Sequence, residues 1–266
     1  MIDFDKKLES FTRDWIRENA GKFKPGELEE KAAQVCELWA SARDPDLSAT
    51  PLDYVRGLST EALAGFMRQN FEENGSIPFV LTDEMQKRPD AEGCLRKFIE
   101  RGGDDELTAT CINILSIRPS IELLKLYLSW LPDKRIPDSL LENVFDVLAQ
   151  NADRVKDDLI KTAHTLNNKT RYDYICDALT NISRQDDAVF ELFLKGLKRG
   201  GSVMFYCACL RKYGDERAVE YLKSLAAVCD YADFLEIRSA LQSLGSDVDV
   251  PRDFSNDESF LKLLKK

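Results

Sequence analysis

The sequence predicts an all-α fold in which an irregular N-terminal helical block precedes stacked helical pairs, an architecture called an α-solenoid. Apolar residues recur at helical spacing along nearly the whole chain, as in Phe4, Leu8, Phe11 and Trp15. From about residue 90, apolar helical patterns alternate with short turns at a near-constant interval. The 266 residues are 44% hydrophobic and 32% charged, a balance that suits exposed helices around a buried core.

The N-terminal block has recognisable helix boundaries but no internal repeat. Thr50 followed by Pro51 is typical of a helix start, because threonine caps free backbone N–H groups and proline fits the first helical position. Ser59 is expected to begin a further helix that ends at Gly75. We assign residues 1–88 to this block, which could cap the stack of pairs that follows.

The repeat becomes visible when the sequence is aligned on one leucine near the end of every second helix. Successive leucines are separated by 33, 31, 31 and 31 residues. The residues four and one before each leucine are also apolar or amphipathic, and these three positions share one helical face. A fixed period with a fixed buried face indicates stacked helical pairs. The fifteen residues are Cys111, Ile114, Leu115, Val144, Val147, Leu148, Ile175, Ala178, Leu179, Tyr206, Cys209, Leu210, Ile237, Ala240 and Leu241.

One junction between pairs is especially distinct. In LRKYGDERAVEYLKSL (210–225), a helix is expected to end at Tyr213 and Gly214, and the next to begin at Ala218 and Val219. This stretch resembles the short HEAT-like repeats first recognised in phycobiliprotein lyases. In those repeats a helix ending in leucine is followed by a Gly-Asp turn and by a helix that opens with Ala-Val.

The resemblance implies about five HEAT-like pairs over residues 89–250, followed by a C-terminal tail over residues 251–266. It is carried by that junction and by the period, since the other junctions depart from the Gly-Asp pattern. HEAT-like arrays serve very different roles, so the resemblance by itself implies no activity.

The residue types that carry catalysis or bind metals are scarce or poorly placed. His164 is the one histidine, near the end of an expected helix, and the chain has no CxxC motif. Cys207 and Cys209 lie two apart on an expected helix, so their side chains point about 200° apart and cannot grip one ion. We therefore expect buried free thiols, no catalytic residue, no metal site and no cofactor.

The formal net charge of −10 narrows the class of partner. Proteins that bind nucleic acids or anionic membranes carry a basic surface, so the acidic balance disfavours both partners. The N-terminus lacks the pattern of a secretory signal, and no apolar run is long enough to span a membrane. Together with the seven cysteines at irregular spacing, these features predict a cytoplasmic protein.

A candidate binding surface follows from the repeat. Positions two, five and six before each aligned leucine point away from the core, and in HEAT-like arrays the second helices line the concave surface. On these positions two middle pairs are acidic and the next pair is apolar. The candidate electrostatic contacts are Glu142, Asp146, Asp173, Tyr174 and Asp177, and the candidate apolar anchor is Met204 and Phe205.

The helix over residues 202–210 is apolar on every side, which leaves two interpretations. Met204 and Phe205 could pack against another element, such as the C-terminal segment ESFLKLLKK or a neighbouring helix. Alternatively, they form an exposed anchor beside the carboxylates, which would suit a helix or loop bearing apolar and basic residues.

The sequence therefore favours a non-enzymatic scaffold or adaptor that binds a protein partner with basic and apolar residues. A HEAT-like nucleic-acid-binding or DNA-repair protein is the alternative, and it requires a basic concave face instead of the acidic one expected here. A bilin-lyase-like enzyme is a third possibility, drawn only from the resemblance. The sequence does not fix the oligomeric state.

Overall fold

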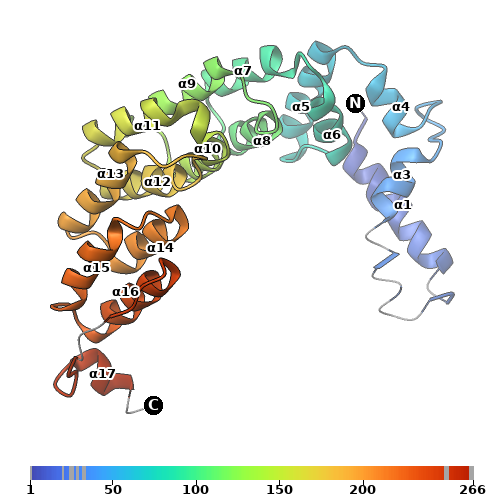
Figure 1. Cartoon of the computed structure of the whole chain (residues 1–266). Coiled ribbons are helices and arrows are strands. Elements are labelled where there is room, and N and C mark those ends of the chain that lie inside the picture. Colours follow the sequence, from blue (N-terminus) through green and yellow to red (C-terminus); the bar gives the residue numbers. More distant parts are fainter. Residues whose placement is uncertain are drawn as a thin grey trace. The chain divides into compact units, whose positions relative to one another are not determined.

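Helices are the dominant secondary structure of the chain (Figure 1). The computed structural model describes residues 2–19, 21–23, 27, 30–31, 34–248 and 252–263. These residues form sixteen α-helices and no β-strand, so the predicted all-α fold is confirmed. The helices belong to two compact units, Met1–Pro119 and Ser120–Lys266.

Unit 1 packs its first helices around a phenylalanine. Phe4 is fully buried, and its ring meets Trp39, Tyr54 and Phe66 edge to face at centroid distances of 6.0, 6.2 and 5.8 Å. Aromatic pairs in this geometry stabilise a core beyond the area they bury. The helices are α1 (Phe4–Asn19), α3 (Val35–Ser41), α4 (Pro51–Arg56), α5 (Thr60–Asn74), α6 (Phe79–Lys87), α7 (Ala91–Arg101) and α8 (Asp105–Leu115).

The predicted helix boundaries of this unit are confirmed. The Thr50 hydroxyl accepts a hydrogen bond from the Asp53 backbone N–H at 3.0 Å, and Pro51 is the first helical residue of α4. The Ser59 hydroxyl accepts one from the Ala62 N–H at 3.2 Å and so caps α5. Helix α5 ends at Gly75, whose φ of 71° is in the left-handed region that glycine adopts without strain.

Unit 2 arranges its helices in two layers. Helix α11 packs on α9 and α13, while α10 packs on α12 and α14 packs on α16. Figure 1 shows α9, α11, α13 and α15, the odd layer, along one side of this unit and α10, α12, α14 and α16, the even layer, along the other. The nine helices described in this unit are α9 (Ile121–Trp130), α10 (Asp138–Gln150), α11 (Ala152–Thr165), α12 (Lys169–Leu179), α13 (Asp187–Lys198), α14 (Val203–Tyr213), α15 (Ala218–Ala226), α16 (Tyr231–Ser243) and α17 (Glu258–Leu263). The packing of alternate helices is compatible with a solenoid.

The predicted burial of the aligned positions is confirmed. All fifteen residues at the aligned leucines and at the positions four and one before them are buried, the most exposed being Leu115 at 6%. They lie on α8 in unit 1 and on the even layer in unit 2. The same helical face therefore meets the core in each of the five pairs.

The predicted domain boundaries stay predictions. The first predicted pair, α7 and α8, lies in unit 1, and the other four pairs lie in unit 2. The predicted boundary at residue 250 falls within residues 249–251, which are outside the described residues, as are residues 264–266 of the tail.

Aromatic side chains of the C-terminal segment cover the last pair. Tyr231 at the start of α16 meets the rings of Phe254 and Phe260 at centroid distances of 5.1 and 4.9 Å. Arg252 lies over the Phe254 ring and donates to the carbonyl oxygens of Ala226, the last residue of α15, and of Cys229. The segment thus satisfies carbonyl groups that the end of a helix leaves free.

A buried arginine joins two successive pairs. Arg171 on α12 is 5% exposed, and its guanidinium donates to the backbone carbonyl oxygens of Leu131, Asp133 and Ile136 at 3.0, 2.7 and 3.1 Å. These carbonyl groups belong to the connection between α9 and α10. One side chain therefore gives hydrogen bonds to three backbone carbonyl groups of this connection, which holds it against α12.

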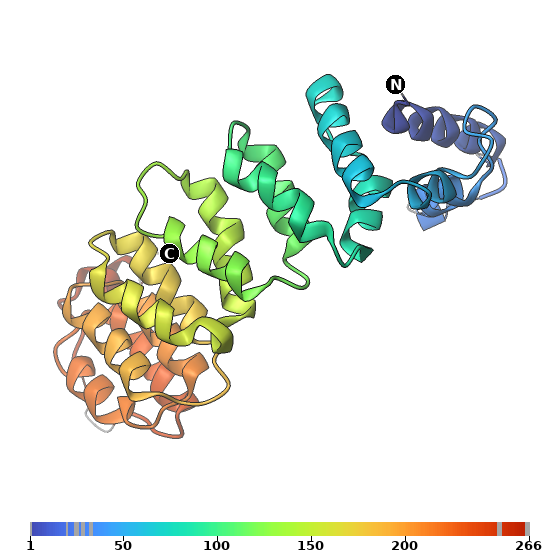
Figure 2. The same cartoon turned by 90° about the horizontal axis from the view of Figure 1, so that it is seen from above.

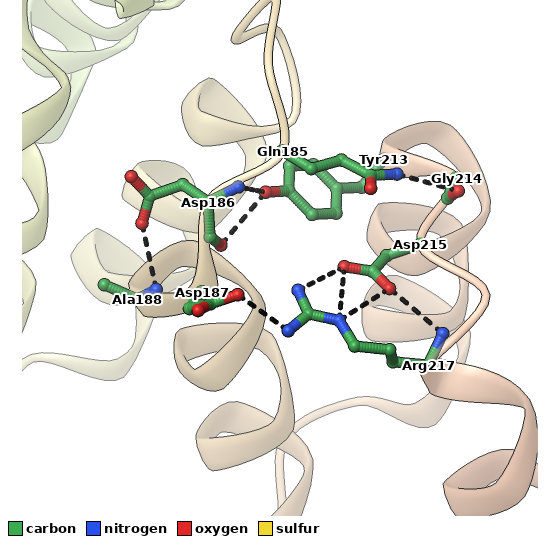
Figure 3. Close-up of polar contacts among 8 residues, drawn as sticks. All are labelled: Gln185, Asp186, Asp187, Ala188, Tyr213, Gly214, Asp215 and Arg217. Atoms are coloured by element: carbon green, nitrogen blue, oxygen red, sulfur yellow. Dashed lines mark hydrogen bonds and ion pairs between the residues drawn. The ribbon is translucent and has the colours of Figure 1, made fainter.

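Three hydrogen bonds connect the start of α13 to the end of α14 and to the Gly-Asp turn that follows it (Figure 3). The Tyr213 hydroxyl accepts from the Asp186 backbone N–H and donates to the Asp186 carbonyl oxygen at 3.1 Å. The Gln185 amide donates to the Gly214 carbonyl oxygen at 3.0 Å. Gly214 itself has a φ of 72° and ends α14, as the sequence predicts.

An arginine completes the same junction. Arg217 donates to both carboxylate oxygens of Asp215 and, at 2.7 Å, to the carboxylate of Asp187 (Figure 3). Its guanidinium lies 4.6 Å from the centroid of the Phe190 ring, in a cation–π contact. Ala218 follows as the first residue of α15, so the predicted start of this helix is also confirmed.

Helix α14 is fixed by a tyrosine that fits against two glycines. A Cβ atom at Gly196 would lie 2.1 Å from the Tyr206 ring, and one at Gly201 would lie 2.3 Å from it. The Tyr206 side chain is 1% exposed, and its hydroxyl donates to the Asp173 carboxylate on α12. The tyrosine therefore ties α12, α13 and α14 together, and only glycine leaves room for it.

Gly196→Ala is expected to lower the free energy of unfolding by about 1–3 kcal/mol, because the new methyl group overlaps a buried ring. Gly65→Ala is the matched control, since Gly65 is also within a helix and nothing lies within 4 Å of its Cβ position. In that control the free energy of unfolding should rise by up to about 1 kcal/mol, because alanine has a higher helix propensity than glycine. Urea denaturation measures both, and equal effects of the two substitutions would contradict the fit around Tyr206.

Asp215→Asn is expected to lower the melting temperature at pH 7 and to have a smaller effect in acid. Hydrogen bonds from Arg217 hold the pKa of the Asp215 carboxyl below its ordinary value. This stabilisation is present above the ordinary pKa and is lost as the pH falls through the lowered one. The gap between the two proteins should therefore narrow between pH 5 and pH 2, whereas Glu216→Gln, on an exposed neighbour, should leave the melting temperature unchanged. A gap that stays constant with pH would count against the role of this pair.

Candidate functional site

The candidate electrostatic residues gather on the outward face of α10 and α12. Glu142 and Asp146 are exposed on α10, and Asp177 is exposed on α12. Asp173 and Tyr174, also on α12, are half-buried. Helices α10 and α12 pack on each other, so these five residues form one surface, called here the acidic strip.

Tyr174 is the aromatic centre of the acidic strip. Its ring stacks on Phe145 of α10 at a centroid distance of 4.6 Å and an interplanar angle of 21°. Burial raises the pKa of Tyr174, and the nearby carboxylates of Glu142 and Asp146 raise it further. The phenol therefore stays protonated at neutral pH. A partly exposed aromatic ring beside carboxylates is a favourable environment for a guanidinium or ammonium group.

Asp173 has an internal partner that the sequence pattern did not reveal. Its carboxylate accepts the hydrogen bond from Tyr206, which the register correctly places in the core. The two residues are 33 positions apart and belong to neighbouring pairs. Asp173 thus connects the acidic strip to the core, while Glu142, Asp146 and Asp177 extend into solvent.

The apolar anchor is exposed in part. Met204 is 61% exposed, and Phe205 is half-buried with its ring edge to face against Tyr206 at 5.0 Å. Leu235 of α16 is 44% exposed and stands six residues before its aligned leucine, as Met204 does. The sequence places Leu235 on the outward face, but only its exposure assigns it to the anchor. Met204, Phe205 and Leu235 are called here the apolar patch.

The C-terminal segment does not bury Met204. Helix α17 packs on α16, where Phe260 contacts Tyr231. Of the two interpretations of the helix over residues 202–210, the structure thus supports exposure at Met204 and burial on the side of Tyr206, Cys207, Cys209 and Leu210.

A cavity of about 290 Å³ opens beside Tyr206. It lies between the start of α12 and the end of α13, where Lys169 donates to the Gly200 carbonyl oxygen and Arg199 lies over the Tyr172 ring. Its walls are Leu166, Asn167, Asn168, Lys169, Tyr172, Asp173, Gly196, Arg199, Gly201 and Tyr206. The size suits a small molecule or one large side chain, and the walls carry charges of both signs.

The described residues offer little support for a metal site, a catalytic histidine or a membrane span. No group of three or more His, Cys, Asp or Glu residues in this part of the chain could hold a metal ion. His164 is exposed in the last turn of α11, with its Nδ1 3.4 Å from the Lys195 ammonium nitrogen. No helix among the same residues has the length and apolar character needed to cross a membrane.

The cysteines are free thiols, as predicted, and most are buried. Burial raises the pKa of Cys111, Cys176 and Cys207 to about 12, and it raises the pKa of Cys209 as well. Because the thiolate is the reactive form, these four side chains are poor nucleophiles at neutral pH.

No family model, curated protein or solved structure matches this chain. The interpretation of its surface therefore depends on the chemistry of the residues themselves.

Brief alkylation with iodoacetamide at pH 8 is expected to modify Cys36 and Cys229 first, because these two side chains are half-buried and the other five are buried. Mass spectrometry of the digested protein measures each site. In denaturant all seven cysteines should react alike. Rapid native labelling of Cys207 or Cys209 would show that α14 is more accessible than its burial indicates.

Proposed function

We propose that this chain is a non-enzymatic protein-binding scaffold or adaptor, and that the outward face of its even layer is the binding surface. The observation that carries the proposal is the exposure of Met204 and Leu235 on a layer that also presents Glu142, Asp146 and Asp177 to solvent. As part of the same proposal, the two layers are interpreted as an α-solenoid.

The apolar patch supports a protein partner. Single exposed apolar residues are common on any protein surface. Met204 and Leu235, however, occupy equivalent positions on two helices that pack against each other, with the Phe205 ring beside Met204. Exposed apolar side chains at equivalent positions of two packed helices are typical of an interaction site.

The acidic strip supports a partner with basic residues. Its exposed carboxylates would steer a basic partner toward the face and raise the association rate at low ionic strength. They would repel the phosphates of a nucleic acid, so this face disfavours the DNA-repair alternative. The free thiols support a reducing, cytoplasmic location for the scaffold.

Affinity capture from native lysate, followed by quantitative mass spectrometry, tests the proposal. Two variants address the two halves of the face: Met204→Glu, and the pair Asp146→Lys with Asp177→Lys. Each changes exposed side chains, so the melting temperature should stay within a few degrees of wild type. The expected result is a protein that wild type captures and that both variants lose at least tenfold.

Matched controls carry the same chemical changes away from the even layer. Val228→Glu alters an exposed apolar residue after α15, and Glu191→Lys with Glu220→Lys reverses two exposed charges on the odd layer. These variants should capture the same partner as wild type. Equal loss in the controls would indicate a nonspecific effect of charge. Undiminished capture by both face variants would refute the proposed surface, and capture of nucleic acid alone would favour the alternative.

A further inference from the structure

We propose that the partner segment is an amphipathic α-helix that lies across the even layer, with basic residues over α10 and α12 and apolar residues over α14 and α16. This inference rests on the proposed function and adds the conformation of the ligand and the order of its contacts.

The chemistry of the even layer changes abruptly between α12 and α14. Six residues before the aligned leucine, the four helices α10, α12, α14 and α16 carry Glu142, Asp173, Met204 and Leu235. Two residues before it, they carry Asp146, Asp177, Ala208 and Ser239. These two outward positions are therefore acidic on the first two helices and uncharged on the last two, while the third, five residues before the leucine, carries Asn143, Tyr174, Phe205 and Glu236.

Contacts within the even layer place its helices in the spatial order α10, α12, α14 and α16. Helix α10 packs on α12, the Tyr206 hydroxyl joins α14 to Asp173 of α12, and α14 packs on α16. A ligand that crosses the layer thus meets two acidic helices, then the apolar α14, and then α16, where Leu235 stands next to Glu236. Glu236 of α16 is half-buried, and Arg211 of α14 donates to Ser239, so charges remain beside the apolar patch.

The spacing of the layer matches the repeat of a helix. Packed helices lie about 8–10 Å apart, which applies to α10 on α12 and to α14 on α16, while the Tyr206–Asp173 hydrogen bond joins α12 to α14. Seven residues of an α-helix rise about 10.5 Å and return to nearly the same face. A partner helix across the layer would thus place residues i, i+7, i+14 and i+21 over α10, α12, α14 and α16.

An extended segment matches the layer less well. It covers about 10 Å in three residues, and an odd number of residues turns the next side chain to the opposite face. Only every second helix of the layer would then receive a side chain. For this reason we assign a helix to the partner and not a strand.

The second basic position is best filled by arginine. Tyr174 offers a partly exposed ring backed by Phe145, with Glu142 and Asp146 beside it. A guanidinium group can stack on the ring and donate to a carboxylate at the same time, which an ammonium group does less well. Phe205 stands at the position of α14 equivalent to Tyr174, next to the uncharged Ala208 and Met204, where an aliphatic side chain would pack.

Two synthetic helical peptides of identical composition test the order of contacts. The block peptide carries Arg, Arg, Leu and Leu at positions i, i+7, i+14 and i+21, and the alternating peptide carries Arg, Leu, Arg and Leu there. Fluorescence anisotropy with the purified full chain measures both affinities. The block peptide is expected to bind at least tenfold more tightly than the alternating peptide.

Variants of the protein test whether the acidic strip and the apolar patch both contribute to peptide binding. Met204→Glu should lower the affinity for the block peptide at least tenfold, and the pair Asp146→Lys with Asp177→Lys should do the same. A third peptide with Glu, Glu, Leu and Leu at the four positions should bind the double lysine variant more tightly than it binds wild type. Val228→Glu should leave every affinity unchanged.

The outcomes separate this inference from the proposed function. Equal binding of the block and alternating peptides, with both weakened by the face variants, would overturn the order of contacts and leave the binding surface standing. Binding that no face variant weakens would overturn both. Absence of binding by either peptide at millimolar concentration would overturn the helical ligand, while the lysate capture would still decide the proposed function.

Discussion

Burial of one apolar helical face, repeated in every pair, is the constraint on which the rest of the structure depends. A lone helical pair cannot cover its own apolar face, and stacking against neighbours on both sides satisfies it. Once the positions of the aligned leucines are buried, the helical rotation of 100° per residue fixes what remains outside. The carboxylates of Glu142, Asp146 and Asp177 are exposed for this reason, and so is Met204.

Much of the fold could be predicted because its determinants are local in sequence. The period, the buried positions, the N-caps Thr50 and Ser59, and the turn at Gly214 each depend on a few neighbouring residues. The polar contacts between pairs could not be predicted in the same way. Arg171 reaches a loop 35 to 40 residues earlier, and nothing in its own neighbourhood identifies that partner.

The residue types on the candidate face could be predicted from the sequence, but their contacts and exposure could not. Helical rotation places Asp173 on the outward face and Tyr206 in the core, yet the structure joins them across two pairs. Likewise, the apolar character of α14 leaves burial and exposure equally compatible with the sequence, because exposure depends on which neighbouring helix covers each side. Whether Leu235 belongs to the apolar patch is a question of the same kind, and the packing of α14 on α16 answers it.

The aromatic cover of the last pair also bears on how molecules associate with one another. Phe254 and Phe260 pack their rings on Tyr231 of α16, and Phe254 also packs on Phe234. A repeat array with an uncovered end offers the same kind of surface that each pair already uses internally, and such head-to-tail contacts do not close, so they lead to fibres. The rings of residues 254 and 260 cover part of α16 and so remove some apolar surface from the reach of a second molecule.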